Sequence, residues 1–442
     1  MIDFFPFDIK QETRNRRERF PPAILPARVK TAEFDRRGNE RPCRKGLRQM
    51  AEIGPAQGLF PDATDEPARP AQPRTGILPS HVIRELIRSK EIAAVRDIEP
   101  RQIQPASLDL RLGPKAHRVR ASFLPGPRQT VAEKIDEFSL HEIDLTQGAV
   151  LETGCVYVVQ LEERLRLRSQ YAGWANPKSS IGRLDVFTRL IADYAEEFDR
   201  VRPGYAGALY AEISPQTFGI LVRRGSRLNQ LRLRRGTPVT SDVKLQAVHE
   251  EIGLVGDGPG QKKVRKATLD LTIDLAGDST KKLVGFKAKK HAALVDVDRV
   301  DFYEPEEFWD PIFATASRKL ILDPNEFYVL ASKEPVKVPP GYAAEMAAYD
   351  TQVGEFRAHY AGFFDPGFGY KTGNERGTRA VLEVRSHQIP FILEDGQLVG
   401  RLVYERMADD PDELYGAAIG SSYQEQGLKL SKHFKAFEPR SR

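Results

Sequence analysis

A short turn near the middle of the chain gathers side chains that could hold an anion. Lys178, Ser179, Ser180 and Arg183 directly follow Pro177, which ends a strand pattern because proline cannot donate to a β ladder. Phosphate oxygens accept hydrogen bonds and never donate them, so they are bound by hydroxyls, by backbone N–H groups in a turn and by fixed cations. A solvated surface turn is the alternative, since serine and lysine are common in loops. Taken alone, the four residues favour that alternative.

The composition is that of an ordinary globular protein. Of the 442 residues, 40% are hydrophobic and 29% are charged. Lysine and arginine number 67 against 62 aspartate and glutamate residues, which gives a net charge of +5. Much of this excess lies in a basic N-terminal arm, and a site for an anionic ligand would also explain it. The charge is therefore too weak to predict a nucleic-acid partner.

The cysteines and the apolar runs indicate the compartment. Cys43 and Cys155 are the two cysteines, and their separation predicts neither a disulfide framework nor a cysteine-based zinc site. No apolar run approaches the ~20 residues that cross a bilayer. The start, MIDFFPFDIK, lacks the basic-then-apolar order of a secretion signal. We therefore expect a cytoplasmic protein without a membrane partner.

Four sequence patterns occur twice, in the same order and about 160 to 170 residues apart. ASLDLRLG, which begins at Ala106, returns as ATLDLTIDLAG at Ala267. The other pairs are VLETGCVYVVQLEERLRLRSQYAG with LILDPNEFYVLASKEPVKVPPGYAA, RPGYAGALYAEIS with DPGFGYKTGNERGTRAVLEVR, and GILVRRGSRLNQLRLRRG with PFILEDGQLVGRLVYERM. One such pair can arise by chance, but four collinear pairs indicate an internal duplication.

Alternating apolar and polar runs separated by turn residues predict a mainly β fold, a sandwich or a barrel with few short helices. The expected segments are lobe 1 at 76–240, a Gly- and Lys-rich linker at 241–264, lobe 2 at 265–430 and a tail at 431–442. Residues 1–75 are rich in Pro, Arg and Gly. We expect them to be disordered, or to be an over-long start with Met50 as the initiator.

Four stretches resemble motifs of the deoxycytidine triphosphate (dCTP) deaminases, which are relatives of the trimeric dUTPases. They are IRELIRSKEIAAVRDIEPRQIQPASLDLRLG, the phosphate motif PKSSIGRLD, the nucleoside motif AGFFDPGFG and the tail SSYQEQGLKLS. They follow the family's order across residues 76–430 and resemble its two-lobed form. The resemblance implies two tandem dUTPase-like lobes, each a jelly-roll-like distorted barrel. It also implies hydrolytic deamination of dCTP to dUTP and ammonia, and it makes phosphate binding the favoured role of the Lys-Ser-Ser turn.

Each lobe keeps a different half of the family's site. Lobe 1 has the phosphate turn, but Arg202 stands where the family has Asp before Pro-Gly. Lobe 2 has Asp365 at that position, but Tyr349, Asp350 and Thr351 replace Lys-Ser-Ser. In the family, the phosphate turn of one subunit faces the nucleoside pocket of its neighbour. We therefore predict one composite site, with the phosphates in lobe 1 and the nucleoside in lobe 2; neutral decay of both sites is the alternative.

The resemblance implies a glutamate as proton shuttle and no protein metal ligands, unlike the zinc deaminases with their H-x-E…P-C-x-x-C pattern. The matching residues are Glu383 in lobe 2 and Glu212 in lobe 1. Each lies in an apolar strand pattern, where burial raises the pKa of a carboxyl and suits it to general acid–base catalysis. A solvent-facing strand glutamate is the alternative for both, and an inactive relic is a further one for Glu212.

The resemblance also implies ligands for the rest of the nucleotide. These are Ala361, Phe363 and Asp365 for the nucleoside, and Tyr415, Tyr423 and Gln426 for a lid. The family often has a lysine before the tail tyrosine, where this chain has Ser422; Arg401 and Lys429 are candidates to replace it. We expect Mg²⁺ to accompany the triphosphate. Feedback inhibition by dTTP and a homo-oligomer stay open, and no nucleic-acid partner is expected.

Two alternatives to deamination alone remain at this point. A dUTP pyrophosphatase, or a bifunctional enzyme that releases dUMP, would need a water aimed at the α-phosphate and Mg²⁺ bridging the phosphates. A non-catalytic protein that binds nucleotides or nucleic acid belongs to a different class. The tail and the segment QPASLDLRLG favour deamination.

Overall fold

The computed structural model describes residues 74–237, 240–256, 264–277, 282–347, 356–358, 362–370, 377–386, 388–416 and 427–438. The chain divides into two compact units, residues 1–69 and 70–442, and every described residue belongs to the second unit. The predicted N-terminal extension, residues 1–75, lies almost wholly outside the described residues.

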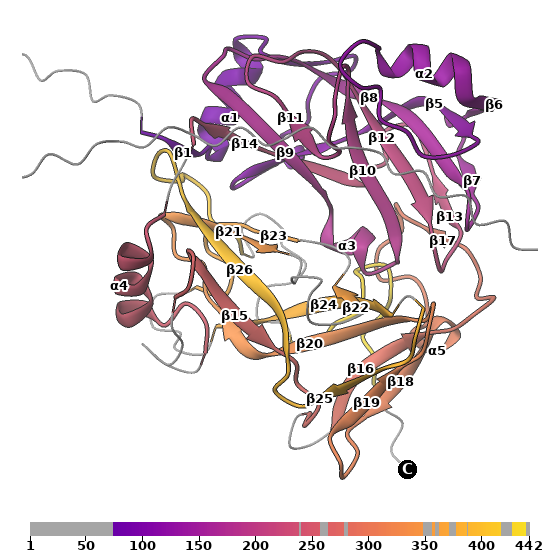
Figure 1. The fold of residues 1–442 in the computed structure, drawn as a ribbon. Coiled ribbons are helices and arrows are strands. Elements are labelled where there is room, and N and C mark those ends of the chain that lie inside the picture. The colour runs from indigo at the N-terminus through magenta and orange to yellow at the C-terminus, as the bar shows by residue number, and fades with distance from the viewer. Residues whose placement is uncertain are drawn as a thin grey trace, which may run out of the picture. The chain divides into compact units, whose positions relative to one another are not determined.

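The first lobe, indigo to magenta in Figure 1, is built mainly of antiparallel strands. They are β1 (Gly76–Ile77), β2 (Ile92–Ala94), β3 (Ile103–Gln104), β4 (Ser107–Leu110), β5 (Leu112–Val119), β6 (Ser139–Asp144), β7 (Ala149–Leu151), β8 (Val156–Arg166), β9 (Tyr171–Pro177), β10 (Val186–Ala192), β11 (Arg200–Val201), β12 (Ala206–Pro215), β13 (Ile220–Val222) and β14 (Asn229–Arg235). The helices are α1 (Ser80–Arg88), the 3-10 turn η1 (Pro100–Gln102), α2 (Val131–Phe138) and α3 (Ser179–Gly182). One sheet has the order β11-β9-β14-β4-β3 and another β10-β12-β8-β5-β6.

The second lobe repeats this plan. Its strands are β15 (Thr268–Thr272), β16 (Leu283–Ala288), β17 (Val295–Asp296), β18 (Trp309–Phe313), β19 (Lys319–Leu322), β20 (Phe327–Val336), β21 (Tyr342–Ala347), β22 (Phe356–Ala358), β23 (Phe363–Phe364), β24 (Thr378–Ser386), β25 (Phe391–Glu394) and β26 (Leu398–Arg406), with helices α4 (Asp242–Ile252) and α5 (Pro305–Phe308). The sheets run β15-β26-β21-β23 and β18-β16-β20-β24-β22. The predicted mainly β fold of two lobes with few short helices is confirmed.

The strand register shows that the two predicted catalytic glutamates occupy equivalent places. In lobe 1, β12 places Glu212 opposite Val158 of β8. In lobe 2, β24 places Glu383 opposite Val329 of β20. The sequence insertion YKTGNERG precedes β24, yet β24 pairs with β20 at the same relative position as β12 pairs with β8. The alignment of the two copies therefore holds at the two glutamates that were predicted to be catalytic.

The last described segment, residues 427–438, packs between the two lobes. The ring of Phe434 lies 5.2 Å from that of Phe308 and 5.8 Å from that of Trp309, both in lobe 2. The ring of Trp309 lies 5.4 Å from that of Phe218 in lobe 1. Phe434 belongs to the same buried cluster as the core of lobe 1, so the segment predicted as a tail is part of the folded core.

The predicted linker contains a helix. Ser241 caps α4, because its side chain accepts a hydrogen bond from the Lys244 backbone, and Gly253 ends the helix in the left-handed conformation. Leu245 is fully buried and belongs to the core of the second lobe. The predicted lobe boundaries themselves stay a prediction.

Candidate active site

One pocket is lined by side chains from both lobes. From the first lobe it takes Pro177, Ser179 and Arg183, and from the second Met346, Gly362, Phe363, Phe364, Asp365, Phe368, Val381, Glu383 and Tyr415. The pocket therefore unites, within one chain, members of the predicted phosphate, nucleoside, catalytic and lid groups.

The phosphate turn lies where β9 ends and the short helix α3 begins. Ser179 and Arg183 line the pocket, whereas the side chain of Ser180 is buried. The carbonyl oxygen of Ser180 accepts a hydrogen bond from Ser431 Oγ at 2.7 Å, and Arg183 Nη1 donates to the carbonyl oxygen of Lys429 at 2.8 Å. The segment after the predicted lid motif thus holds the turn in place.

Lys178 stands outside the lining of this pocket. Its ammonium group pairs with the carboxylate of Asp109 on β4, and Arg227 Nη1 lies 3.5 Å from the same carboxylate oxygen. Asp109 is buried, so it needs these cations to offset the loss of its hydration. Within the described residues, the charge of Lys178 is directed to Asp109 and not into the pocket.

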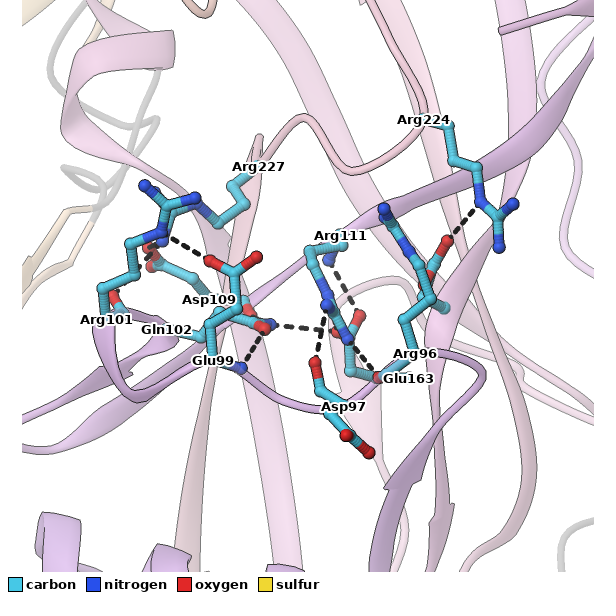
Figure 2. A network of polar contacts seen from close by, with 11 residues as sticks. Arg96, Asp97, Glu99, Arg101, Gln102, Asp109, Arg111, Glu163, Arg224 and Arg227 are labelled. Atoms are coloured by element: carbon cyan, nitrogen blue, oxygen red, sulfur yellow. Dashed lines mark hydrogen bonds and ion pairs between the residues drawn. The ribbon is translucent and has the colours of Figure 1, made fainter. Parts of the chain in front are cut away.

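A network of buried polar side chains contacts the backbone of Asp109, as Figure 2 shows. Gln102 donates one hydrogen bond to the carbonyl oxygen of Asp109 at 2.9 Å and another to Glu163 at 3.0 Å. Arg111 pairs with Glu163 through its Nε at 2.8 Å, and the side chains of both are almost wholly buried. Gln102, Arg111 and Glu163 each have a hydrogen-bond partner, so they hold the strand that carries Asp109 in place, although Asp109 Oδ1 has no partner among the described residues.

Glu383 has the environment of a general acid–base catalyst. Its side chain is 5% exposed, and Arg183 Nε lies 3.7 Å from Oε1. Burial raises the pKa of Glu383 to about 7, although the guanidinium of Arg183 acts in the opposite direction. A carboxyl group that titrates near neutral pH can both take and return a proton.

Glu212, the equivalent residue of lobe 1, is placed differently. It is buried, and both Nε and Nη2 of Arg189 donate to its Oε1. The guanidinium carbon of Arg189 also lies 3.5 Å from the ring centroid of Phe198. Glu212 is absent from the lining of the pocket that contains Glu383. Glu212, which was predicted as a catalytic residue with an inactive relic as the alternative, therefore has the contacts of a structural ion pair.

Asp365 is held by a residue that the sequence analysis missed. Arg232 of β14, in lobe 1, is fully buried, and its Nη2 lies 2.9 Å from Asp365 Oδ1. Burial raises the pKa of Asp365, and Arg232 opposes that rise. The signal that could have revealed Arg232 is a mismatch between the repeats, because the second lobe has Val403 at the equivalent position.

The predicted lid is described in part. Tyr415 lines the pocket, and its backbone N–H donates to the carbonyl oxygen of Pro366 at 2.7 Å. Gly367 comes so close to the Tyr415 backbone that a Cβ there would lie 2.9 Å from its nitrogen. The predicted site residues Ala361, Tyr423 and Gln426 lie outside the described residues.

Neither candidate for the missing phosphate cation lines this pocket. Arg401 Nε pairs with Asp270 at 3.2 Å, and the backbone carbonyl oxygen of Lys429 accepts a hydrogen bond from Arg183. In the part of the chain that the structure describes, no three His, Cys, Asp or Glu residues form a group that could hold a metal ion. The same part contains no helix that is long and apolar enough to cross a membrane.

Comparison with known proteins gives matches along both lobes. A family model described as 2'-deoxycytidine 5'-triphosphate deaminase, N-terminal domain, matches residues 74–237, and the C-terminal domain model of the same family matches residues 241–434.

A relative from Nanoarchaeum equitans, named "dCTP deaminase, dUMP-forming", is 30% identical over 189 residues, which cover 38% of this chain and 88% of the relative. A dCTP deaminase from Alteromonas mediterranea is 29% identical over 118 residues, covering 25% of this chain and 57% of that protein. The crystal structure of 2'-deoxycytidine 5'-triphosphate deaminase from Agrobacterium tumefaciens is 53% identical, with a TM-score of 0.73, and the match covers 77% of this chain and all of that one.

Proposed function

Because the chain belongs to the 2'-deoxycytidine 5'-triphosphate deaminase family, we propose that it hydrolyses the 4-amino group of dCTP. Water adds to C4 of the cytosine ring and the amino group leaves, so that dCTP and water give dUTP and ammonia. Such a reaction needs a group that accepts a proton from the water and delivers protons to N3 and to the leaving nitrogen.

Glu383 is the residue that supports this proposal most directly. A buried carboxyl with a pKa near 7 is partly ionised at neutral pH, so it can take the proton of the attacking water. The same carboxyl, once protonated, can donate to the departing amine. Arg183, 3.7 Å away, favours the ionised form and so keeps the base available before water attacks.

The remaining pocket residues of the two lobes are expected to bind different parts of the substrate. Ser179 and Arg183 are positioned to bind phosphate oxygens with a hydroxyl and a guanidinium. Phe363 and Asp365, which line the pocket from lobe 2, are expected to bind the nucleoside. Mg²⁺ bound to the triphosphate would enter as part of the substrate.

The decisive experiment compares Glu383→Gln with the matched variant Glu212→Gln in an assay for ammonia release from dCTP. We expect Glu383→Gln to bind dCTP but to turn over at least ~100-fold more slowly, because glutamine cannot shuttle a proton. Glu212→Gln is expected to keep its turnover. Ammonia release by Glu383→Gln at the wild-type rate would contradict the assignment.

A bifunctional reaction is the second candidate, since the relative from Nanoarchaeum equitans carries the name of a dUMP-forming enzyme. Chromatography of the nucleotide products separates the two: dUTP alone supports deamination only, whereas dUMP with pyrophosphate supports the bifunctional enzyme. Feedback inhibition by dTTP, a homo-oligomer and a cytoplasmic location stay predictions. Adding dTTP to the same assay tests the first of them.

A further inference from the structure

Arg232 belongs to the first lobe, but its contacts lie in the nucleoside half of the pocket. Its Nη2 is 2.9 Å from Asp365 Oδ1, and its Nη1 donates to the carbonyl oxygen of Ala344 at 3.0 Å. Nη2 also lies 3.4 Å from the carbonyl oxygen of Phe364. The guanidinium carbon sits 4.0 Å from the centroid of the Phe363 ring. One side chain of lobe 1 therefore contacts the three residues that precede Pro-Gly in lobe 2, Phe363, Phe364 and Asp365.

The contact with Asp365 determines what that carboxyl can do. A buried carboxylate without a cation would take up a proton, and a protonated carboxyl becomes a donor as well as an acceptor. Arg232 favours the ionised form of Asp365 because its Nη2 pairs with Oδ1 at 2.9 Å. For Oδ2, the structure shows no donor among the described residues. That oxygen is left to accept a hydrogen bond from a hydroxyl in the pocket.

We propose that Arg232 is a positioning residue: it holds Asp365 as an ionised acceptor for a hydroxyl group of the substrate's sugar. The inference rests on the proposed function, since it concerns how the nucleoside of dCTP is held. Other charges also reach Asp365: Lys178 favours its ionised form, and Asp109 opposes it. Of the charged side chains shown around Asp365, Arg232 is the one in direct contact with it.

The exchanged arrangement, an arginine of lobe 2 paired with an aspartate of lobe 1 at the equivalent positions, does not occur. The registers of β14 with β9 and of β26 with β21 make Val403 the second-lobe counterpart of Arg232. Where lobe 2 has Asp365, lobe 1 has Arg202. Valine cannot pair with a charged group, and arginine cannot accept a hydrogen bond. The arginine and the aspartate therefore occur together at one of the two possible sites of the chain.

The test uses the full-length protein and three variants, Arg232→Met, Asp365→Asn and the double variant, with KM and kcat for dCTP measured by ammonia release from pH 6 to 9. We expect Arg232→Met to raise KM roughly 10- to 100-fold with little change in kcat, because the lost contact serves ground state and transition state alike. This KM should fall as the pH rises, since Asp365 regains its charge. In Asp365→Asn, adding Arg232→Met should change KM less than about 2-fold, because Arg232 acts through Asp365.

Arg234→Met is the matched control, because Arg234 lies two residues further along β14 and packs over Trp174 at 5.0 Å. An equal rise in KM for this control, or additive effects in the double variant, would overturn the inference. If Arg232→Met fails to fold, the KM of Asp365→Asn is compared with that of the double variant to test the inference. Equal KM values then support the inference, and a further rise overturns it. Failure of the wild type to release ammonia from dCTP would instead overturn the proposed function.

Discussion

Replacing Glu383 with glutamine should make the protein more stable, by an amount that grows as the pH rises from about 4.5 to 7. Glutamine has nearly the same shape and keeps an oxygen near Arg183, whose Nε lies 3.7 Å from Glu383 Oε1. It does not titrate, so it removes the energetic penalty of ionising a buried carboxyl. The variant thus separates the two consequences of burial, since catalysis is lost while stability is gained.

The size of the effect follows from the pKa of Glu383. The carboxyl titrates near its ordinary value of 4.5 in the unfolded chain and near 7 in the folded protein. Between these values the folded protein binds the proton more tightly, so the free energy of unfolding falls as the pH rises. One pKa unit corresponds to about 1.4 kcal/mol, so about 3 kcal/mol present below pH 4.5 is lost above pH 7. Glu383→Gln should match the wild type near pH 4 and exceed it by about 3 kcal/mol at pH 8.

Thermal unfolding of both proteins between pH 4 and 8 measures this difference. We expect the midpoint of Glu383→Gln to rise above that of the wild type by on the order of 5 °C at pH 8. Glu212→Gln is the control at the equivalent position: Glu212 accepts two charge-assisted hydrogen bonds from Arg189, which a neutral glutamine weakens, so this variant should lower the midpoint. A difference between Glu383→Gln and the wild type that does not change with pH would refute the reasoning.

Three further outcomes follow from the pocket. The kcat/KM of the wild type for dCTP should rise about tenfold per pH unit and level off near pH 7, because the base must be ionised; a flat profile from pH 5 to 8 would count against Glu383 as the base. Arg183→Gln should move that break to higher pH, since Arg183 lowers the pKa of Glu383, and an unmoved break would exclude this coupling. Mixing Ser179→Ala chains with Glu383→Gln chains should restore no activity, because both residues line the pocket of one chain; recovery would show that sites form between chains.

The duplication made much of the site predictable. Because the copies align collinearly, the sequence alone placed Glu383 and Glu212 at equivalent positions, and the strand registers agree. The family predicted from the motifs is confirmed. Ser179 and Glu383 were predicted to share a composite site, and they line one pocket although 204 positions separate them in the numbering.

Contacts that depend on burial could not be predicted in the same way. In β14, Leu231, Arg232 and Leu233 are all buried, whereas the alternation of leucine and arginine suggests a strand with one solvated face. A buried arginine needs a carboxylate from elsewhere in the fold, and Asp365 is supplied by the other lobe. Lys178 is the converse case: its motif predicts that it lies in the phosphate site, but its side chain pairs with Asp109 and does not line the pocket.

The placement of residues 427–438 has a consequence for synthesis of the protein. Leu430 and Phe434 complete the core of the lobe that the ribosome makes first, and the Lys429 carbonyl and Ser431 hydroxyl secure its substrate-binding turn. The first lobe can therefore complete its core only after residues 427–438 have been synthesised and have left the ribosome. A chain truncated before residue 427 would lack the two hydrogen bonds that this segment makes with the phosphate turn.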